Sequence, residues 1–234
     1  MSSTRTATGS AAATFAAAYI AVTLAQITNA FPGALNGQFA AEFHTSGSGL
    51  TWISSIFVIA IVVFELTFGV LGDLFGRKKL LYAGAAFIFV GTLVAGFATT
   101  TGIMILGQAI GGIGAGILFP ISLSMIAAIT PDMKSRARVI ATWAGFLSLG
   151  AVISPVVAGI AVQVFTVPGL ELGSPNIFSG WRVTYYFAAA VAVVVFLFAL
   201  RAQDSSAPAG RRLDVPGQAT LALGLIAALS ATVH

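Results

Sequence analysis

The sequence predicts an all-α polytopic membrane protein, a six-helix bundle followed by a seventh transmembrane helix. Charged residues make up only 8% of the 234 positions and hydrophobic residues 58%, whereas soluble proteins carry about a quarter charged residues. The few charges fall between apolar runs. Each run reaches the ~20 residues that are needed to cross a bilayer. These observations exclude a soluble fold.

We expect seven helices joined by short connections rich in Gly, Pro, Ser and Thr. They span residues 12–34, 50–72, 80–98, 102–129, 139–165, 183–200 and 216–234. The chain then divides into a six-helix bundle (1–200), a cytoplasmic linker (201–215) and the seventh helix (216–234). The linker prediction rests on its polar composition and its Pro and Gly residues.

The distribution of lysine and arginine predicts the orientation. Arg182 alone lies on one side of the membrane, and the other ten of the 11 basic residues lie on the opposite side. Those ten are Arg5, Arg77, Lys78, Lys79, Lys134, Arg136, Arg138, Arg201, Arg211 and Arg212. Because basic loops stay in the cytoplasm, we expect a multi-pass protein of the cytoplasmic (inner) membrane with its N-terminus inside. A nucleic-acid partner is not expected, since the basic residues alternate with membrane spans.

Glu65 is the only ionisable residue that lies well inside a predicted span. It precedes Gly69 and Asp73 at intervals of four residues, so all three share one face of the second helix. Acids inside a membrane are costly and often mark a pathway, which makes Glu65 a candidate for proton exchange near neutral pH. The alternative is a protonated Glu65 that hydrogen-bonds a neighbouring helix.

The connection between the second and third helices carries a dense motif. From Gly69 to Lys79 it reads Gly-Val-Leu-Gly-Asp-Leu-Phe-Gly-Arg-Lys-Lys. Asp73 and Arg77 are four residues apart and can pair if the helix continues. Gly76 permits a sharp helix exit through a left-handed conformation, and the lysines can anchor the next span at an anionic leaflet. A purely topological anchor is the alternative, although bare lysines would serve that purpose equally well.

Small residues recur at helical spacing in the fourth and fifth helices. The fourth has Gly107/Gly111 and Gly112/Gly116, and such pairs let helix backbones approach closely. The fifth has a motif with the same property, made of Gly150, Ser154, Pro155, Ala158 and Gly159. These faces either pack statically or slide in a conformational cycle.

The motif from Gly69 to Lys79 resembles the gating loop of the major facilitator superfamily. The resemblance is closest to the fourteen-helix drug:proton antiporters, of which the chain matches the N-terminal half. It extends to Ala30-Phe31-Pro32, to the fifth-helix motif, to Trp181-Arg182 and to the run Leu213–Gly217. It assigns gating roles to Gly69, Gly72, Asp73, Gly76, Arg77 and Lys78. The fold that it implies is a half-bundle built as a 3+3 inverted repeat.

This resemblance implies half of a secondary active transporter that exports a small amphiphilic or drug-like compound in exchange for protons. A second half is then required, as a separate chain, a second copy or a missing C-terminal part, and we favour a different chain. A seven-helix receptor is disfavoured because its N-terminus would lie outside. A non-transporting membrane subunit or sensor that retains the fold is the alternative.

Polar residues on the first helix are candidates for lining a substrate cavity. They are Tyr19, Thr23 and Gln26, with Asn29 beside them, and the resemblance places Gln108 of the fourth helix opposite. Polar contacts between packed helices are the alternative. The sequence departs from the family at two of these positions: Thr23 stands near an acidic position, and Gln108 replaces an arginine. Glutamine hydrogen-bonds a ligand but holds no charge.

No cofactor or metal site is expected. The chain has no cysteine, and His44 lies in a loop without a second ligand nearby. The glycine-rich stretch 111–116 lies within a span and lacks the Lys-Ser/Thr of a nucleotide-binding loop. Nothing in the sequence resembles a hydrolytic triad. We therefore do not expect an enzyme.

Overall fold

The computed structural model describes residues 9–165 and 178–207, together with separate residues between 216 and 227. Within these ranges there are six helices, each long and apolar enough to cross a membrane. They are α1 (Ala11–Phe43), α2 (Gly47–Phe75), α3 (Arg77–Gly96), α4 (Thr101–Ala128), α5 (Met133–Phe165) and α6 (Gly180–Arg201). Six of the predicted spans are confirmed. The predicted seventh helix, 216–234, lies mostly outside the described residues.

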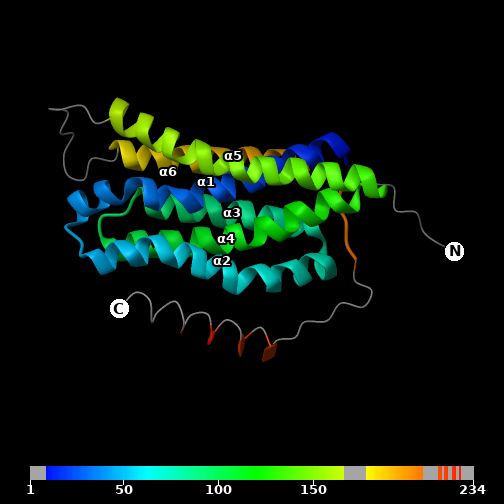
Figure 1. The fold of residues 1–234 in the computed structure, drawn as a ribbon, viewed down its shortest axis with the longest axis horizontal. Helices are drawn as coiled ribbons and strands as arrows, with labels where there is room; N and C mark the ends of the chain where they lie inside the picture. Colours follow the sequence, from blue (N-terminus) through cyan, green and yellow to red (C-terminus); the bar gives the residue numbers. More distant parts are fainter. Residues whose placement is uncertain are drawn as a thin grey trace.

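Successive helices run in opposite directions, so the connections gather at two ends of one elongated bundle (Figure 1). The α2–α3 and α4–α5 connections and the end of α6 lie together at what we call the basic end, which holds Arg77, Lys78, Arg136 and Arg201. The α1–α2 and α3–α4 connections lie at the opposite end. This separation is the one that the lysine and arginine distribution predicts.

The central helices are α1 and α4, which contact each other and hold more buried residues than any other helix. The main partners of α4 are α3 and α2, while α1 packs mainly against α5 and α6. The outer helices α2 and α5 bury the smallest share of their apolar windows. They therefore leave much of their surface uncovered within the described residues.

Glycines let α4 approach two neighbours at backbone contact distance. A methyl group on Gly107 would meet the backbone nitrogen of Ala95 in α3 at 2.5 Å. One on Gly112 would meet the carbonyl oxygen of Phe57 in α2, also at 2.5 Å. Distances this short exclude a side chain, so the glycine pairs of α4 are packing positions, as small-residue motifs in membrane helices predict.

Two helix ends differ from the predictions by more than five residues. We expected the first helix to stop at residue 34, but α1 continues through Pro32, which lacks an amide donor, to Phe43. Leu35 and Phe39 are fully buried beyond the proline, and Phe39 makes an edge-to-face contact with Trp181 of α6 at 5.4 Å. This packing offsets the hydrogen bond that the proline removes.

The fifth helix also begins earlier than predicted, at Met133 instead of residue 139. The Asp132 carboxylate accepts a hydrogen bond from the Ser135 amide at 2.8 Å, which satisfies a donor in the first turn. Hydrogen bonds from Ser135 hold the pKa of the Asp132 carboxyl below its ordinary value. The basic residues 134–138 therefore lie on the first turns of a helix.

Candidate functional site

The motif between α2 and α3 is a break of a single residue at the basic end. The first helix of the pair ends at Phe75, Gly76 stands alone, and α3 begins at Arg77. Gly76 has φ +100° and ψ 125°, which is a region for glycine but not the left-handed helical conformation that we expected. Only an extended turn with positive φ lets the two helices follow each other without a loop.

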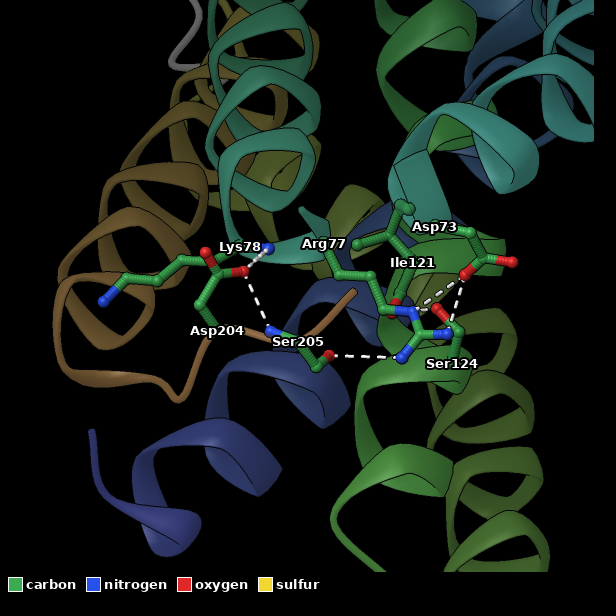
Figure 2. Close-up of polar contacts among 7 residues, drawn as sticks. All are labelled: Asp73, Arg77, Lys78, Ile121, Ser124, Asp204 and Ser205. Atoms are coloured by element: carbon green, nitrogen blue, oxygen red, sulfur yellow. Dashed lines mark hydrogen bonds and ion pairs between the residues drawn. The ribbon is translucent and has the colours of Figure 1, made fainter. Parts of the chain in front are cut away.

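Asp73 and Arg77 pair across this break, as their spacing predicts. The Arg77 Nη2 and Nε atoms donate to the same Asp73 oxygen, Oδ1, at 2.7 and 3.1 Å. Both residues are buried, at 5% and 8% exposure. The third nitrogen, Nη1, donates to the Ser205 hydroxyl at 3.2 Å, so the guanidinium lies between the acid and the chain that follows α6 (Figure 2). A buried ion pair with this many partners holds one geometry of the loop.

A groove between α2 and α4 leads from this pair toward the middle of the bundle. It has a volume of about 360 Å³. Its walls are Glu65, Leu66, Gly69, Val70, Asp73, Arg77, Pro120 and Ser124. The prediction that Glu65, Gly69 and Asp73 share one face of the second helix is confirmed. Glu65 is half-buried, and it reaches the same groove as the ion pair.

A second, shallower pocket of about 230 Å³ adjoins this groove through Arg77 and Ser124. Arg136 of α5 forms its far wall and donates from Nε to the Thr130 carbonyl at 3.0 Å. The two adjoining pockets therefore form one surface, which runs from Glu65 within the span of α2 to Arg77 and Arg136 at the basic end.

Of the remaining motif residues, Gly69 and Gly72 face α4. A methyl group on Gly72 would collide with the Ile121 side chain, and one on Gly69 would touch Pro120 at 3.7 Å. We expected Lys78 to anchor the span at a lipid leaflet. In the structure its ammonium instead donates to the carbonyls of Leu200 and Ala202 at 2.9 Å each. Lys79 is the exposed lysine of the pair.

The polar row of α1 faces α5. The Tyr19 ring stacks on Phe146 at 4.9 Å, and the Thr23 hydroxyl donates to the Phe146 carbonyl at 3.1 Å. The Gln26 side chain lies beside Gly150, where a methyl group would approach it to 2.9 Å. Asn29 is half-buried farther along the helix. The cavity role of this row stays a prediction.

Gln108 lies elsewhere in the bundle. Its amide donates to the Tyr185 hydroxyl of α6, and both side chains are almost fully buried, at 2% and 1% exposure. Phe31 of α1 closes the site with an edge contact to the Tyr185 ring at 5.5 Å. In this arrangement Gln108 is part of a buried contact between α4 and α6, and none of its hydrogen bonds reaches the polar row of α1.

The fifth-helix motif divides between two faces. Gly150, Ser154 and Ala158 are buried against α1, where the Ser154 hydroxyl donates to the Ile27 carbonyl at 3.0 Å. Pro155 and Gly159 are exposed, and a methyl group on Gly159 would meet nothing within 4 Å. Gly150 and Ser154 therefore lie at a close contact between α5 and α1.

Our sequence reasoning missed a cluster at the opposite end. Arg182 donates to Glu42 at 2.6 Å, to the carbonyl of Gly96 at the end of α3 at 2.9 Å, and to the carbonyl of Ala98 just beyond it at 2.7 Å. Trp181 donates its indole N–H to the other Glu42 oxygen at 2.6 Å. Glu42 lies beyond residue 34, where the predicted first helix ends, and the continuation of α1 brings it to Arg182. A lone arginine at the start of a span was the signal that could have revealed the cluster.

The described residues contain no group of three or more His, Asp or Glu side chains that could hold a metal ion. No reacting constellation is evident among them.

Six membrane-length helices in one bundle define a multi-pass membrane protein. A family model described as Major Facilitator Superfamily matches residues 6–232, and the chain belongs to that superfamily. Its members are transporters and not enzymes.

Relatives with assigned names are similar to this chain at low identity. Multidrug resistance protein Stp of Mycobacterium tuberculosis is 26% identical over 194 residues, which cover 82% of this chain and 33% of that protein. Multidrug efflux pump LfrA of Mycolicibacterium smegmatis is 30% identical over 126 residues, 54% of this chain and 25% of that protein. The uridine/deoxyuridine transporter of Lactococcus lactis is 28% identical and covers 82% of this chain.

Among solved structures, the inward open conformation of the xylose transporter XylE from E. coli aligns with a TM-score of 0.69 at 15% identity. The alignment covers 94% of this chain and 53% of that transporter. This likeness establishes the fold. The chain spans about a third of the length of the Stp protein and about half of XylE.

Proposed function

We propose that this chain forms one half of a secondary active transporter that exports a small amphiphilic compound by rocking alternating access. The observation that carries the proposal is the buried Asp73–Arg77 pair at the head of a groove that also contains Glu65. Static membrane anchors do not need a buried ion pair on a one-residue turn. A loop that must hold one geometry and then release it does.

Proton coupling belongs to the same proposal, with Glu65 as the proton site. Glu65 is half-buried and shares its groove with the gating pair, so a change in its charge acts on the field around Arg77. The names of the relatives Stp and LfrA support efflux of drug-like compounds, while the uridine transporter keeps other substrates open.

The helix packing supports a 3+3 inverted repeat. Exchanging α1 with α4 and α2 with α5 converts the α1–α5 pair into the α4–α2 pair, and both are major contacts. The α1–α4 contact is unchanged by this exchange, and so is the α3–α6 contact when α3 is exchanged with α6 as well. Such an internal symmetry is the basis for alternating access in this superfamily.

A second half is part of the proposal because a half-bundle has only one wall of a central cavity. The uncovered faces of α2 and α5 are the surfaces that it would contact. A different chain is favoured over a second copy. Gln108 and Thr23 stand where the family has charged residues, and a diverged second half can supply such charges.

A non-transporting membrane subunit is the second candidate function. One observation favours it: the Gln108 amide nitrogen donates to the Tyr185 hydroxyl, and both side chains are almost fully buried. Transport measurements separate the two functions.

The test is substrate efflux from cells or inverted vesicles that contain this chain together with its second half. We expect energised efflux of a cationic or neutral amphiphilic dye above the empty-vector rate. The change Asp73→Asn should slow efflux while the amount of inserted protein stays the same. If the wild-type complex is stable and moves none of a broad dye panel, the subunit function replaces the transporter function.

A further inference from the structure

The chain that follows α6 crosses the basic end in an extended conformation and lies on the α2–α3 motif (Figures 1 and 2). We call residues 203–207 the strap. The sequence predicts this segment to be a linker between two units. In the structure it is hydrogen-bonded to the motif at several points, even though more than a hundred residues separate the two segments in the chain.

The start of α3 needs a partner that its own sequence does not supply. Gly76 occupies the N-cap position, has no side chain, and provides no capping hydrogen bond. The first amide groups of a helix have no partner within the helix, and a Ser, Thr, Asp or Asn normally accepts from one of them. The N-terminus of α3 therefore has no side-chain cap from the motif itself.

Asp204 of the strap supplies this cap. Its Oδ1 accepts a hydrogen bond from the Lys78 amide at 3.2 Å, and its carboxylate lies at the positive end of the α3 dipole. The same Oδ1 accepts from the Ser205 amide at 2.9 Å, which fixes the carboxylate on its own backbone. A methyl group on Gly76 would lie 3.3 Å from the Asp204 oxygens. The glycine therefore also makes room for the cap.

The contact is reciprocal, because Lys78 caps α6 in return. Its ammonium donates to the carbonyls of Leu200 and Ala202, which belong to the last turn of α6 and the residue that follows it. A cation at a helix C-terminus is favourable for the same electrostatic reason as an anion at an N-terminus. One acid and one lysine thus join the start of α3 to the end of α6.

The strap also holds the ion pair itself. The Arg77 amide donates to the Ser205 carbonyl at 2.9 Å, and the Ala207 amide donates to the Asp73 carbonyl at 3.0 Å. With the Ser205 hydroxyl on the Arg77 guanidinium, the strap contacts both members of the pair. The other end of the strap is fixed to α1, where the Gln203 amide donates to the Thr14 hydroxyl at 2.8 Å.

We propose that Asp204 is a positioning residue for the gating motif, and that the strap couples the chain leaving α6 to the Asp73–Arg77 pair. In this arrangement the strap cannot leave without uncapping α3 and removing a partner from Arg77. Movement of the strap away from the motif, toward the second half, therefore also releases the gate that the Asp73–Arg77 pair forms. The gating part of this inference rests on the proposed transport function, whereas the capping part does not.

The first experiment measures hydrogen exchange of the amides at positions 76–79 by mass spectrometry, on the full chain in lipid nanodiscs. For Asp204→Ala we expect exchange about fivefold faster, the factor for loss of a typical N-cap. Asp204→Asn should restore the wild-type rate because asparagine caps helices as well as aspartate does. Asp204→Ser, with a shorter reach, should be intermediate and serves if the alanine variant does not fold.

Asp132→Ala is the matched control. It removes an acidic cap at the same end of the bundle, but from α5. Exchange at positions 133–136 should rise in this variant while positions 76–79 keep the wild-type rate. Unchanged exchange at 76–79 in both Asp204→Ala and Asp204→Ser would overturn the role of Asp204.

The second experiment addresses the coupling to the gate. In the efflux assay, Asp204→Ala combined with Asp73→Asn should slow transport no further than Asp73→Asn alone, because both changes act on one contact network. Asp132→Ala combined with Asp73→Asn should show independent effects. Independent effects for Asp204 would reject coupling to the gate, and absence of transport in the wild type would reject the proposed function while the exchange result stands.

Discussion

Glu65 occupies a position where its charge state has consequences. It lies on the groove wall one turn from Gly69 and two turns from Asp73, in a span that carries no other ionisable side chain before the motif. Transferring a proton there changes the charge next to a buried ion pair. Under the proposed function, this position makes Glu65 the candidate proton site.

We predict that Glu65→Gln abolishes the pH dependence of efflux. Glutamine keeps the size and the hydrogen-bonding capacity of the side chain but cannot exchange a proton. The measurement is efflux rate against external pH in vesicles. The control is Asp132→Asn, which neutralises an exposed acid at the basic end and keeps a capping oxygen. A Glu65→Gln protein with the wild-type pH profile would remove Glu65 from the coupling mechanism.

Arg182 is the other residue whose environment demands an explanation. It is 1% exposed and bonds to α1 and α3 from the first turn of α6. Its guanidinium also lies 4.3 Å from the Trp181 ring centre. Because a buried charge without partners is costly, these contacts are what permit an arginine at this depth.

We predict that Arg182→Ala lowers the free energy of unfolding by roughly 2 kcal/mol, because Glu42 and two backbone carbonyls at and just beyond the end of α3 lose a charged donor. Arg182→Lys should recover only part of it, since an ammonium cannot reproduce the planar fork. Thermal unfolding followed by the fluorescence of the tryptophans measures this. Lys79→Ala, an exposed lysine, is the control. Equal stability of Arg182→Ala and Lys79→Ala would contradict the cluster's structural role.

Helix pairs in this bundle are held by backbone proximity as much as by side chains. The α4 glycines show this on both sides, against Phe57 of α2 and Ala95 of α3. In a bilayer, the apolar surface of a helix is already surrounded by apolar lipid, so burying it against another helix gains little free energy. Close backbone packing therefore contributes much of the helix-pairing energy. A methyl group added at Gly107 or Gly112 must push two helices apart.

We predict that Gly112→Ala destabilises the bundle by roughly 1 to 3 kcal/mol, the usual cost of overpacking. Gly159→Ala should be neutral or slightly stabilising, because a methyl group there meets nothing and alanine favours helix. The two variants introduce the same atom into helices of the same bundle, and thermal unfolding compares them. Equal losses would show that α4 is not packed through its glycines.

In a complete transporter the Gly159 variant carries a further consequence. The residue lies on the uncovered face of α5 together with Val152, Val156 and Ile160. If the second half contacts this face, Gly159→Ala is neutral in the isolated chain and costly in the complex. This difference would locate the contact on α5.

The whole molecule has two uncovered helices on the flanks of a well-packed centre. Side chains of α1 and α4 fill the interior, whereas α2 and α5 expose many of their apolar residues. Lipid can cover such faces, and so can the second half that the proposed function requires. The chain covers only 33% of the length of the Stp protein, so a second half is a testable explanation of the uncovered faces.

We predict that native mass spectrometry of the tagged chain, purified in mild detergent from its own host, shows a complex with a second membrane protein of similar size. Two identical chains would instead support a homodimer with a symmetric cavity. A monomer at all detergent concentrations would contradict the two-chain arrangement. Transport measurements on the chain alone would then not test the proposed function.

The amino-acid sequence alone was sufficient to predict the membrane class, the six spans and their alternating direction. It also predicted the Asp73–Arg77 pair and the helix face that Glu65 and Asp73 share. These features depend on local properties: hydropathy over about twenty residues, charge next to each span, and a spacing of four residues along one helix. Each can be calculated without knowing which helix lies beside which.

Three-dimensional packing was needed for the features that join distant segments. The Asp204 cap on α3, the Glu42–Arg182 cluster and the Gln108–Tyr185 contact each connect residues from different helices or connections. The continuation of α1 through Pro32 likewise depends on Phe39 finding Trp181. Such contacts follow from which helix faces meet, and no local pattern in one chain encodes that choice.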